Sequence, residues 1–510
     1  MQQITVLDFG GAYAQLVARR IRDAHVYCEV LPHNTALETV LAKKPAGLVL
    51  CGPELSVSAA DMPKADPALY ACGVPVLGVG YGFALMASQL GGQVEARAEA
   101  APVEAVLAPV VRSALFAGTA PSFTLSFRAA DRVAAAPGGF AAVAGNDALG
   151  ILAMEDTARR LYGVAAHSDL CEAEGSHQML RAFLFESCGC AADWTTQAFV
   201  DNSVAAIREQ VGDGRVLLGL SGGVDSSVCA ALIHRAIGDR LSCVFVNHGF
   251  MRKGEPEQVC QVFSQTFPVH LVAVDAVARF QAQVDGVDDP ELKRKRIGAE
   301  FIAVFAEEAA KLGRIDYLAQ GTIYPDIIES GAIPGAPVIK SHHNVGGLPK
   351  DLQFAGLVEP LKYLFKDEVR RVGEALGLPG DMVWRQPFPG PGLAVRVLGA
   401  ITQEKLHIVR ESDAIVREEI AAAGLDRSIN QYFALLTGVR TVGIHGEERS
   451  YDYTIGIRAV ITDTFVTGDW ARIPHDVLAQ MSARIVAEVP HVNRVVYDIT
   501  CKPPAAIEWE

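Results

Sequence analysis

The sequence predicts an α/β protein built from two α/β units, the second with a doubly wound parallel sheet, and a smaller α+β unit after them. Short, continuous apolar runs alternate with segments of helical spacing through roughly the first 390 residues, which is typical of buried parallel strands and their connecting helices. The order changes after Gly390, where one long helical segment precedes a group of strand-like runs. At roughly 100–200 residues per domain, 510 residues allow about three such units.

The first unit is expected over residues 1–195. The apolar runs Ile4–Phe9, Gly47–Leu50 and Val74–Val79 have the character of strands that are covered on both faces. Ala14–Arg22 has helical spacing between the first two runs. This alternation predicts a layered α/β domain.

The second unit is expected over residues 200–386 and the third over residues 387–510. The expected strands of the second unit are Arg215–Leu220, Ser242–Val246, Val269–Asp275 and Tyr317–Gln320, with helices that include Ser226–Ile237 and Ala299–Lys311. The third unit is expected to contain a helix over Thr402–Ala423 and strands at Arg440–Gly443, Tyr453–Val460 and Arg494–Ile499. The Pro- and Gly-rich run from Pro387 to Gly392 marks the boundary between them.

The composition argues against several classes of protein. Half of the residues are apolar and 20% are charged, so the chain is expected to fold throughout. Its 45 Lys and Arg against 59 Asp and Glu give a formal charge of −14, which argues against a general binder of nucleic acid or of membrane surfaces. No signal-peptide pattern and no run of about 18 apolar residues occurs in the sequence. The ten cysteines lack short repeated spacings, which predicts reduced thiols and a cytoplasmic protein.

A glycine-rich loop follows the first expected strand of the second unit and leads directly into a helix. It reads Ser221-Gly222-Gly223-Val224-Asp225-Ser226-Ser227. Glycines at such a junction let backbone N–H groups approach an anion closely, the positive end of the helix faces that anion, and serine hydroxyls add donors. The loop therefore predicts a site for a phosphate chain. No lysine follows the glycines, so it differs from a Walker A loop.

This string resembles the pyrophosphate loop of the N-type ATP pyrophosphatases, which split ATP into AMP and pyrophosphate. The resemblance implies that residues 221–227 bind ATP as a co-substrate. It also implies that Asp225 is catalytic and helps to hold Mg²⁺, a cation that prefers oxygen ligands. Val246, at the end of the next strand, is expected at the same carboxyl edge, where open α/β sheets bind ligands. Asn247 stands where related enzymes often carry Asp, so it either contacts the nucleotide or is a simple loop residue.

Five further strings resemble the GMP synthetase family. They are DPELKRKRIG at residues 289–298, QGTIYPD at 320–326, IKSHHNVGGLP at 339–349, RQPFPGPG at 385–392 and KPPAAIEWE at 502–510. The resemblance places Gly321 at the ATP site. It implies XMP binding by Arg294, Pro389, Gly390, Pro391, Lys502, Ile507 and Glu508. Without it, the basic run Lys293–Arg296 would be interpreted as a solvated face.

In that family the segment at 339–349 is a mobile lid. The resemblance implies that Lys340, as a catalytic residue, and Lys350 meet the ATP phosphates when the lid closes and excludes water from the adenyl intermediate. The neighbouring pair His342 and His343 could instead suggest a metal site, although adjacent residues rarely share one ion without other ligands.

Residues 1–195 resemble a class I glutamine amidotransferase whose catalytic residues have been replaced. That family presents a cysteine on a strand-to-helix elbow inside a Gly-x-Cys-x-Gly string, which here reads Gly78-Val79-Gly80-Tyr81-Gly82. Glycine has no side chain, so the thiolate that attacks the amide of glutamine is missing. Other departures are Ala84 for Gln, Cys51-Gly52-Pro53 for Gly-Gly-Pro, and His167-Ser168-Asp169 for His-Pro-Glu.

Two cysteines could in principle replace the missing nucleophile. Cys51 is expected near the former oxyanion turn and Cys171 near His167, but neither is on the elbow that exposes a nucleophile. The degenerate site of Gly80, His167 and Asp169 is therefore expected to be inactive.

These resemblances together imply an ATP- and Mg²⁺-dependent enzyme that converts XMP to GMP through adenyl-XMP, releasing AMP and pyrophosphate. Its nitrogen would come from free ammonia or from an external protein donor. The third unit resembles the family's dimerisation domain, so a homodimer is expected. Two alternatives stay open: a synthetase that acts on an unusual purine nucleotide, and a non-catalytic regulator that only binds nucleotides.

Overall fold

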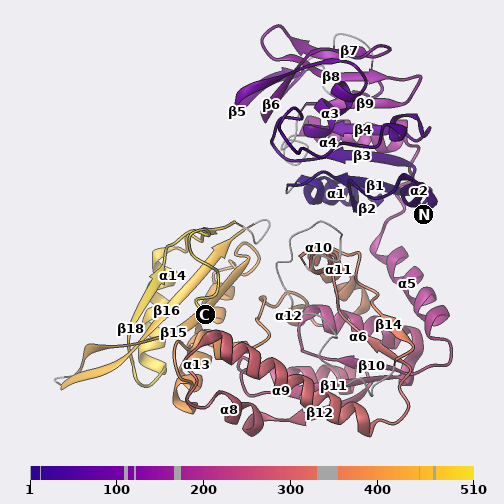
Figure 1. Ribbon diagram of the computed structural model, residues 1–510. Coiled ribbons are helices and arrows are strands. Elements are labelled where there is room, and N and C mark those ends of the chain that lie inside the picture. The colour runs from indigo at the N-terminus through magenta and orange to yellow at the C-terminus, as the bar shows by residue number, and fades with distance from the viewer. Residues whose placement is uncertain are drawn as a thin grey trace. The chain divides into compact units, whose positions relative to one another are not determined.

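A computed structural model of the chain describes residues 2–11, 13–107, 109, 113–119, 122–165, 174–329, 354–446, 448–462 and 467–510. These residues form two compact units. From here on, the first unit means residues 2–199 with 325–329. The second unit means residues 200–324 with 354–510, and it contains both regions expected after residue 200. The chain passes between the units within helices α5 (Thr196–Val211) and α10 (Tyr324–Glu329), both labelled in Figure 1. Among the described residues, no helix is long and apolar enough to cross a membrane.

The first unit is built on a mixed sheet with the strand order β2-β1-β3-β4-β9-β8-β6-β5, and β7 pairs with β8 (Figure 1). The strands are β1 (Gln3–Asp8), β2 (Tyr27–Pro32), β3 (Gly47–Cys51), β4 (Val76–Val79), β5 (Gln93–Leu107), β6 (Phe123–Ala135), β7 (Ala141–Asn146), β8 (Gly150–Asp156) and β9 (Leu161–Val164). The part from β2 to β9 is parallel, and the remaining strands pair antiparallel. Its helices are α1 (Tyr13–Asp23), α2 (Leu37–Ala42), α3 (Tyr81–Gln89) and α4 (Glu174–Ala182).

The parallel part of this sheet agrees with the sequence, whereas the antiparallel part was not predicted. Every residue of β3 and β4 is buried, as expected for strands covered on both faces. Strand β5 is rich in Ala and Glu, which favour helices over strands, so its composition conceals its pairing with β6.

The second unit contains a parallel sheet with the strand order β12-β11-β10-β13-β14. Its strands are β10 (Val216–Gly219), β11 (Leu241–Asn247), β12 (His270–Asp275), β13 (Tyr317–Ala319) and β14 (Gly356–Val358). The helices around it are α6 (Val224–Ile237), α7 (Glu255–Gln261), α8 (Val277–Val284), α9 (Pro290–Lys311), α11 (Lys366–Leu376) and α12 (Gly380–Val383). The chain runs from β10 outward to β12 and then returns to the other side of β10. The strand order therefore reverses beside β10, and ligands of open α/β sheets bind at such a point.

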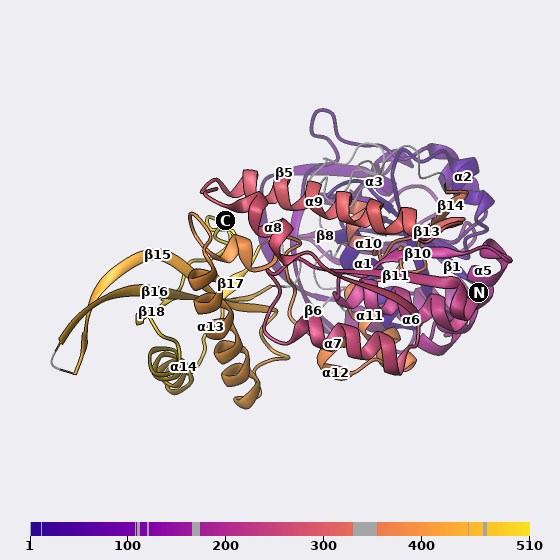
Figure 2. The same ribbon diagram turned by 90° about the horizontal axis from the view of Figure 1, so that it is seen from below.

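The C-terminal part of the second unit is α+β, as predicted. Strand β16 (Glu448–Ile461) pairs antiparallel with β15 (Gln431–His445) and β17 (Asp469–Trp470), and parallel with β18 (Val492–Asp498). Helices α13 (Gln403–Ala422) and α14 (His475–Glu488) pack on one another and on this sheet. Strands β15 and β16 form a long, curved hairpin (Figure 2).

Some predicted elements proved too short. The helix expected at Ala299–Lys311 begins at Pro290, because the Asp289 side chain caps it by accepting from the N–H of Leu292 at 2.6 Å. The strand expected at Arg440–Gly443 is one part of β15, which an irregularity between Leu436 and Arg440 divides.

One hydrophobic core joins the parallel sheet to the C-terminal sheet. It includes Val246 and Phe280 beside the parallel sheet, and Leu393, Ile455 and Ile457 from the C-terminal part. Because interiors are densely packed, this shared core holds the two parts of the second unit in a fixed relation.

Candidate active site

The glycine-rich loop lies between β10 and α6, where the strand order reverses. Gly222 has φ +76°, and a Cβ on it would lie 2.8 Å from Cγ2 of Val259, so the position requires glycine. The Oγ of Ser221 accepts from the N–H of Gly223 at 3.3 Å, and lies 3.0 Å from the Oγ of Ser226. The loop is thus held by its own hydroxyls at the N-terminal end of a 14-residue helix.

Hydrogen-bond donors of the loop remain for a ligand. The Oγ of Ser227 is buried and has no hydrogen-bond partner among the described residues. Val224, the first residue of α6, is also buried, and the N-cap Gly223 has no side chain that could cover the helix end. Unpaired N–H groups at a helix N-terminus attract anions, so the geometry suits a phosphate chain.

Asp225 is paired with a lysine that the sequence did not indicate. The Nζ of Lys366 lies 2.8 and 2.6 Å from the two carboxylate oxygens of Asp225, which is 141 positions away in the chain. Lys366 is the first residue of α11, and the N–H of Phe365 donates to Glu368 in that helix's first turn. Both side chains of the pair remain partly exposed, at 28% for Asp225 and 35% for Lys366.

The residues present fit a magnesium ion that is bound mainly through the nucleotide. Mg²⁺ commonly binds through one or two carboxylates together with substrate phosphates, and keeps several waters. Asp225 supplies one partly exposed carboxylate at the end of the loop. Among the described residues, no group of three or more His, Cys, Asp and Glu could hold a metal ion by itself.

Gly321 lies against the loop, and Val246 lies behind the site. A Cβ on Gly321 would approach the backbone of Asp225 and Ser226 to 3.0 Å, so glycine allows the chain that follows β13 to pass close to α6. Val246 is buried in β11. The Oδ1 of the following residue, Asn247, accepts from the N–H of Gly249 at 3.1 Å, as in an Asx turn.

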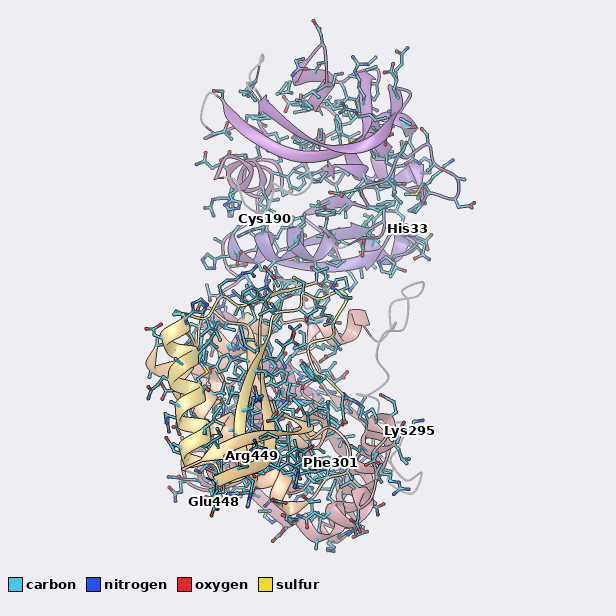
Figure 3. All side chains as sticks on the ribbon, turned by 90° about the vertical axis from the view of Figure 1, so that its left-hand side faces the viewer. His33, Cys190, Lys295, Phe301, Glu448 and Arg449 are labelled. Atoms are coloured by element: carbon cyan, nitrogen blue, oxygen red, sulfur yellow. The ribbon has the colours of Figure 1, made fainter. Side chains whose placement is uncertain are left out.

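Most of the residues assigned to XMP gather around the last residues of the chain. Arg294 donates to the backbone oxygen of Glu510. Its neighbour Lys293 is fully buried, with Nζ 2.5 Å from Oε2 of Glu510 and 2.8 Å from the carbonyl oxygen of Val397. Within this run, Lys295, labelled in Figure 3, and Arg296 are the exposed members. Helical periodicity explains the mixture, because adjacent residues of a helix point to different sides.

The other assigned residues belong to the same C-terminal part. Glu508 is bound by Arg396 at 3.0 and 3.2 Å, and the Pro389–Pro391 turn, which includes Gly390, is closed by the N–H of Gly392 donating to Pro389 at 2.9 Å. Ile507 packs against the side chains of Phe433, Leu435 and Val460. Lys502 is placed by two backbone hydrogen bonds to Gly468, each of 2.8 Å.

Several predicted residues lie outside the described part of the chain. They are Lys340, His342, His343 and Lys350 of the expected lid, and His167, Asp169 and Cys171 of the former glutaminase site.

Comparisons with known proteins match three stretches of the chain to family models and nearly its whole length to individual relatives. Residues 5–187 match the family model described as glutamine amidotransferase class-I, residues 196–293 match NAD synthase, and residues 418–509 match the GMP synthase C terminal domain. A protein of Acetivibrio thermocellus is 52% identical over 507 residues, which are 99% of both chains. One of Geobacillus kaustophilus is 53% identical over 509 residues, covering 100% of this chain and 99% of the relative. Both relatives are named GMP synthase [glutamine-hydrolyzing].

The chain belongs to the GMP synthase family. The order of the three matches corresponds to the order of the α/β, parallel-sheet and α+β regions. The two α/β regions and the α+β tail expected from the sequence are thereby confirmed as a fold class. The exact boundaries near residues 195 and 386 stay predictions.

The amidotransferase elbow of this GMP synthase family member keeps its backbone shape. Gly80 lies between β4 and α3 with φ +54° and ψ −106°, a strained turn of the kind that exposes a nucleophile. A Cβ on Gly78 would lie 2.6 Å from the carbonyl oxygen of Gly82, and one on Gly82 would lie 2.2 Å from that of Leu50. The outer glycines are therefore needed for packing, whereas the central position presents no side chain.

The groups around this elbow are occupied by internal contacts. The hydroxyl of Tyr81 donates to the carbonyl oxygen of Pro63 at 2.6 Å, and its ring closes against Gly52, where a Cβ would lie 2.5 Å away. Burial, followed by the charge of Asp131, raises the pKa of Tyr81 to about 12, so its hydroxyl stays protonated at neutral pH. Cys51 is fully buried at the end of β3.

Proposed function

We propose that this protein catalyses the ATP-dependent amination of XMP to GMP, using free ammonia or ammonia from another protein. The synthetase half of the proposal is supported by the phosphate loop with Asp225 and Lys366, and by relatives that share about half of their residues with it. The observation that carries the nitrogen source is Gly80 at the retained elbow. A cytoplasmic location is part of the same proposal.

The reaction proceeds in two balanced steps. First, the C2 oxygen of XMP attacks the α-phosphorus of ATP, so that an O–P bond forms and the bond to pyrophosphate breaks. Ammonia then attacks C2, the C2–O bond to AMP breaks, and AMP leaves with the electron pair while a proton is released from nitrogen. The protein contributes mainly by positioning and by stabilising charge.

Each residue of the loop has a defined task in this proposal. Backbone N–H groups at Gly222 and in the first turn of α6, with the hydroxyl of Ser227, donate to the oxygens of the leaving pyrophosphate. Lys366 adds a positive charge beside them and is held in place by Asp225. Mg²⁺, when bound with ATP at Asp225, would neutralise further negative charge on the phosphates.

Glutamine is not expected to serve as the nitrogen donor. Attack on its amide requires a thiolate on the elbow, and Gly80 supplies none. Ala84 and Cys51 replace two further residues of the amidotransferase pattern, so restoring one group would not rebuild the site. The relatives named as glutamine-hydrolyzing share the fold of this domain, and the proposed difference lies in its side chains.

The deciding experiment compares nitrogen sources. AMP and GMP are measured with XMP, ATP and Mg²⁺, supplied with either ammonium chloride or ammonia-free glutamine. We expect GMP with ammonium and only background formation with glutamine. Equal rates from glutamine at neutral pH would refute the loss of glutaminase activity. A Cys51→Ser variant is the matched control, because a buried cysteine away from the elbow should affect neither rate.

We also propose that the protein is a homodimer through the hairpin of β15 and β16. Large apolar side chains are exposed on it, including Val442 at 58%, Ile444 at 79% and Tyr451 at 62%. Exposed apolar groups in such number are typical of an association surface. Glu448 and Arg449, labelled in Figure 3, begin β16 at the tip of this hairpin. Sedimentation should give a dimer for the native chain, and a Tyr451→Glu substitution should shift it to monomer. A monomeric native chain would contradict the proposal.

A further inference from the structure

A series of alternating charges extends through the second unit from the phosphate loop towards Glu508. It begins at Arg385, which donates to the carbonyl oxygen of Gly222 and forms an ion pair with Glu255. Glu255 in turn lies 3.5 Å from Nη1 of Arg252, measured from its Oε1. One end of the series is therefore attached to the backbone that is proposed to receive the pyrophosphate.

Asp413, on α13, is the central member. Its Oδ2 lies 3.4 Å from Nε of Arg252, and its Oδ1 lies 3.5 Å from Nη1 of Arg396. Arg396 binds both carboxylate oxygens of Glu508, at 3.0 and 3.2 Å. The side chains of Asp413, Arg252 and Arg396 are 1% exposed or less. The other end of the series is thus attached to the segment assigned to XMP.

The same two arginines hold the Pro-rich segment that joins the two parts of the unit. Arg252 donates to the carbonyl oxygens of Gln386 and Pro387, each at 3.2 Å. The ring of Phe388 contacts both guanidinium groups, with centroids 4.3 Å from Cζ of Arg252 and 5.1 Å from Cζ of Arg396. The residues immediately before the Pro389–Pro391 turn are therefore fixed by the partners of Asp413.

The two central members of the series, Asp413 and Arg252, remain charged at neutral pH. Burial would raise the pKa of Asp413, but Arg252, Arg396 and Arg417 outweigh that effect and hold the pKa below its usual range. Burial lowers the pKa of Arg252 to about 10, which still leaves it protonated.

Stability alone is a poor explanation for such a series. Removing charges from water costs several kcal/mol for each ion, and well-packed apolar residues often stabilise a core as well or better. A buried ion pair does fix the direction and distance of its partners, because leaving one charge unpaired is strongly unfavourable. The position of this series, between two half-sites whose ligands must react with each other, favours a role in alignment.

We propose that Asp413 is a positioning residue of the synthetase site, holding the pyrophosphate loop and the segment around Glu508 in register through Arg252 and Arg396. The inference rests on the proposed amination of XMP. Asp413 contacts neither nucleotide in this proposal. Its loss should therefore leave each nucleotide able to bind, while the C2 oxygen and the α-phosphorus are no longer correctly aligned.

The test is the Asp413→Asn substitution, which removes the charge and preserves the size. Misplacement of reacting groups by about 1 Å can cost about 100-fold in rate. We expect kcat for AMP formation with XMP and ammonium to fall about 30-fold. KM for ATP and for XMP should each change less than about threefold, because the contacts that bind each nucleotide equally in the ground state and the transition state are unaffected. An unchanged kcat in the folded variant would overturn the inference.

Arg417→Ala is the matched control. Arg417 contacts the same carboxylate, with Nε 3.0 Å from Oδ2, but it is 30% exposed and is not a member of the series between the half-sites. It should lower the thermal unfolding midpoint by less than Asp413→Asn does, while kcat stays within about twofold of the native value. An equal loss of kcat in both variants would also overturn the inference, because it would mean that the charges of the series act only through the stability of the fold.

If Asp413→Asn does not fold, Arg252→Lys replaces it in the test. Lysine keeps the charge but cannot bind Asp413 and the two carbonyl groups of 386 and 387 at once. The same fall in kcat with little change in KM is expected, and its absence would contradict the inference. A native protein that forms no AMP from XMP would instead refute the proposed function, so the two failures are distinguishable.

Discussion

The phosphate loop and the amidotransferase elbow are two versions of one structural device. Each is a glycine-containing turn that leads from a parallel strand into a helix, with a positive φ of +76° at Gly222 and +54° at Gly80. Each occurs at the carboxyl end of its strand, where α/β sheets place their reactive groups. They differ in what surrounds the turn. Asp225 and Lys366 face one another beside the first loop, whereas Gly80, at the centre of the second turn, has no side chain.

This difference separates conformation from chemistry. The elbow keeps its shape because Gly78 and Gly82 are needed for close packing of β4, α3 and β3, and that packing benefits folding whether or not a nucleophile is present. The phosphate loop is held by packing at Gly222 and by the hydroxyls of Ser221 and Ser226, but the buried hydroxyl of Ser227 has no structural partner among the described residues. A match to a fold therefore identifies the turn, and only the side chains identify the reaction.

The largest expected effect tests the phosphate loop. Asp225→Ala removes both the ligand proposed for Mg²⁺ and the partner that orients Lys366. Loss of one preorganised charge-stabilising group costs about 100- to 1000-fold in rate, so kcat for AMP release should fall about 1000-fold. The measurement is AMP release with XMP, ATP and saturating ammonium.

The variant should remain folded, because Asp225 is partly exposed and its pair with Lys366 adds little to stability. An unchanged unfolding midpoint with lost turnover is therefore expected. Full activity in the variant would remove Asp225 from the site.

The sequence predicted the local features of both regions correctly. The loop from Ser221 to Ser227 and the string around Gly80 are continuous in the chain, and strand–turn–helix patterns are read from neighbouring residues. Buried strands such as β3 and β4 were recognisable for the same reason, because their apolar runs are uninterrupted.

Features that depend on long-range pairing were not predictable from these patterns. Lys366 reaches Asp225 across 141 residues, and Lys293 reaches Glu510 across 217. A basic run such as Lys293–Arg296 has the composition of a solvated helix face, and its first member is buried by partners distant in the chain, Val397 and Glu510. The carboxylate Asp413 lies within an ordinary helical pattern, and its partners come from other elements.

The second prediction tests whether the elbow is purely structural. In Gly82→Ala the added methyl would meet the carbonyl oxygen of Leu50 at 2.2 Å, which is backbone and cannot move away easily. Overpacking of this kind costs about 1–3 kcal/mol, so the first unit should unfold at a lower denaturant concentration. The kcat for GMP formation from ammonium should be unchanged in the folded protein.

Gly138→Ala is the control for this variant. Gly138 belongs to the same unit, and a Cβ there would meet nothing within 4 Å. Its free energy of unfolding should change by less than about 0.5 kcal/mol. An equal loss of unfolding free energy in both variants would contradict the packing role of the elbow glycines. A loss of ammonium-dependent kcat in Gly82→Ala would contradict a purely structural elbow.

The smallest expected effect uses pH to separate the two regions. In the second unit, burial lowers the pKa of His248 to about 4, and its Nδ1 accepts from the N–H of Phe250 at 3.2 Å. The unfolded chain, with a histidine pKa of about 6.5, binds a proton more readily than the folded one, so stability falls as pH decreases below about 6.5. In the first unit, burial raises the pKa of Asp131 despite its bonds to Ser56 and Val57, so acidification favours its folded form.

Between pH 7.5 and pH 6, His248 should therefore cost the second unit about 1 kcal/mol of unfolding free energy. The measurement is denaturant unfolding at both pH values, monitored by tryptophan fluorescence. Trp384 and Trp470 report on the second unit and Trp194 reports on the first, each in a variant in which the other tryptophans are replaced. His248→Asn keeps an acceptor for the N–H of Phe250 but cannot titrate, so its second unit should lose this part of the pH dependence. An undiminished fall in the variant would mean that another group behind the loop takes up the proton. In that case protonation of His248, within the Asn247–Gly249 turn, would not be the cause of the lower stability of the second unit in acid.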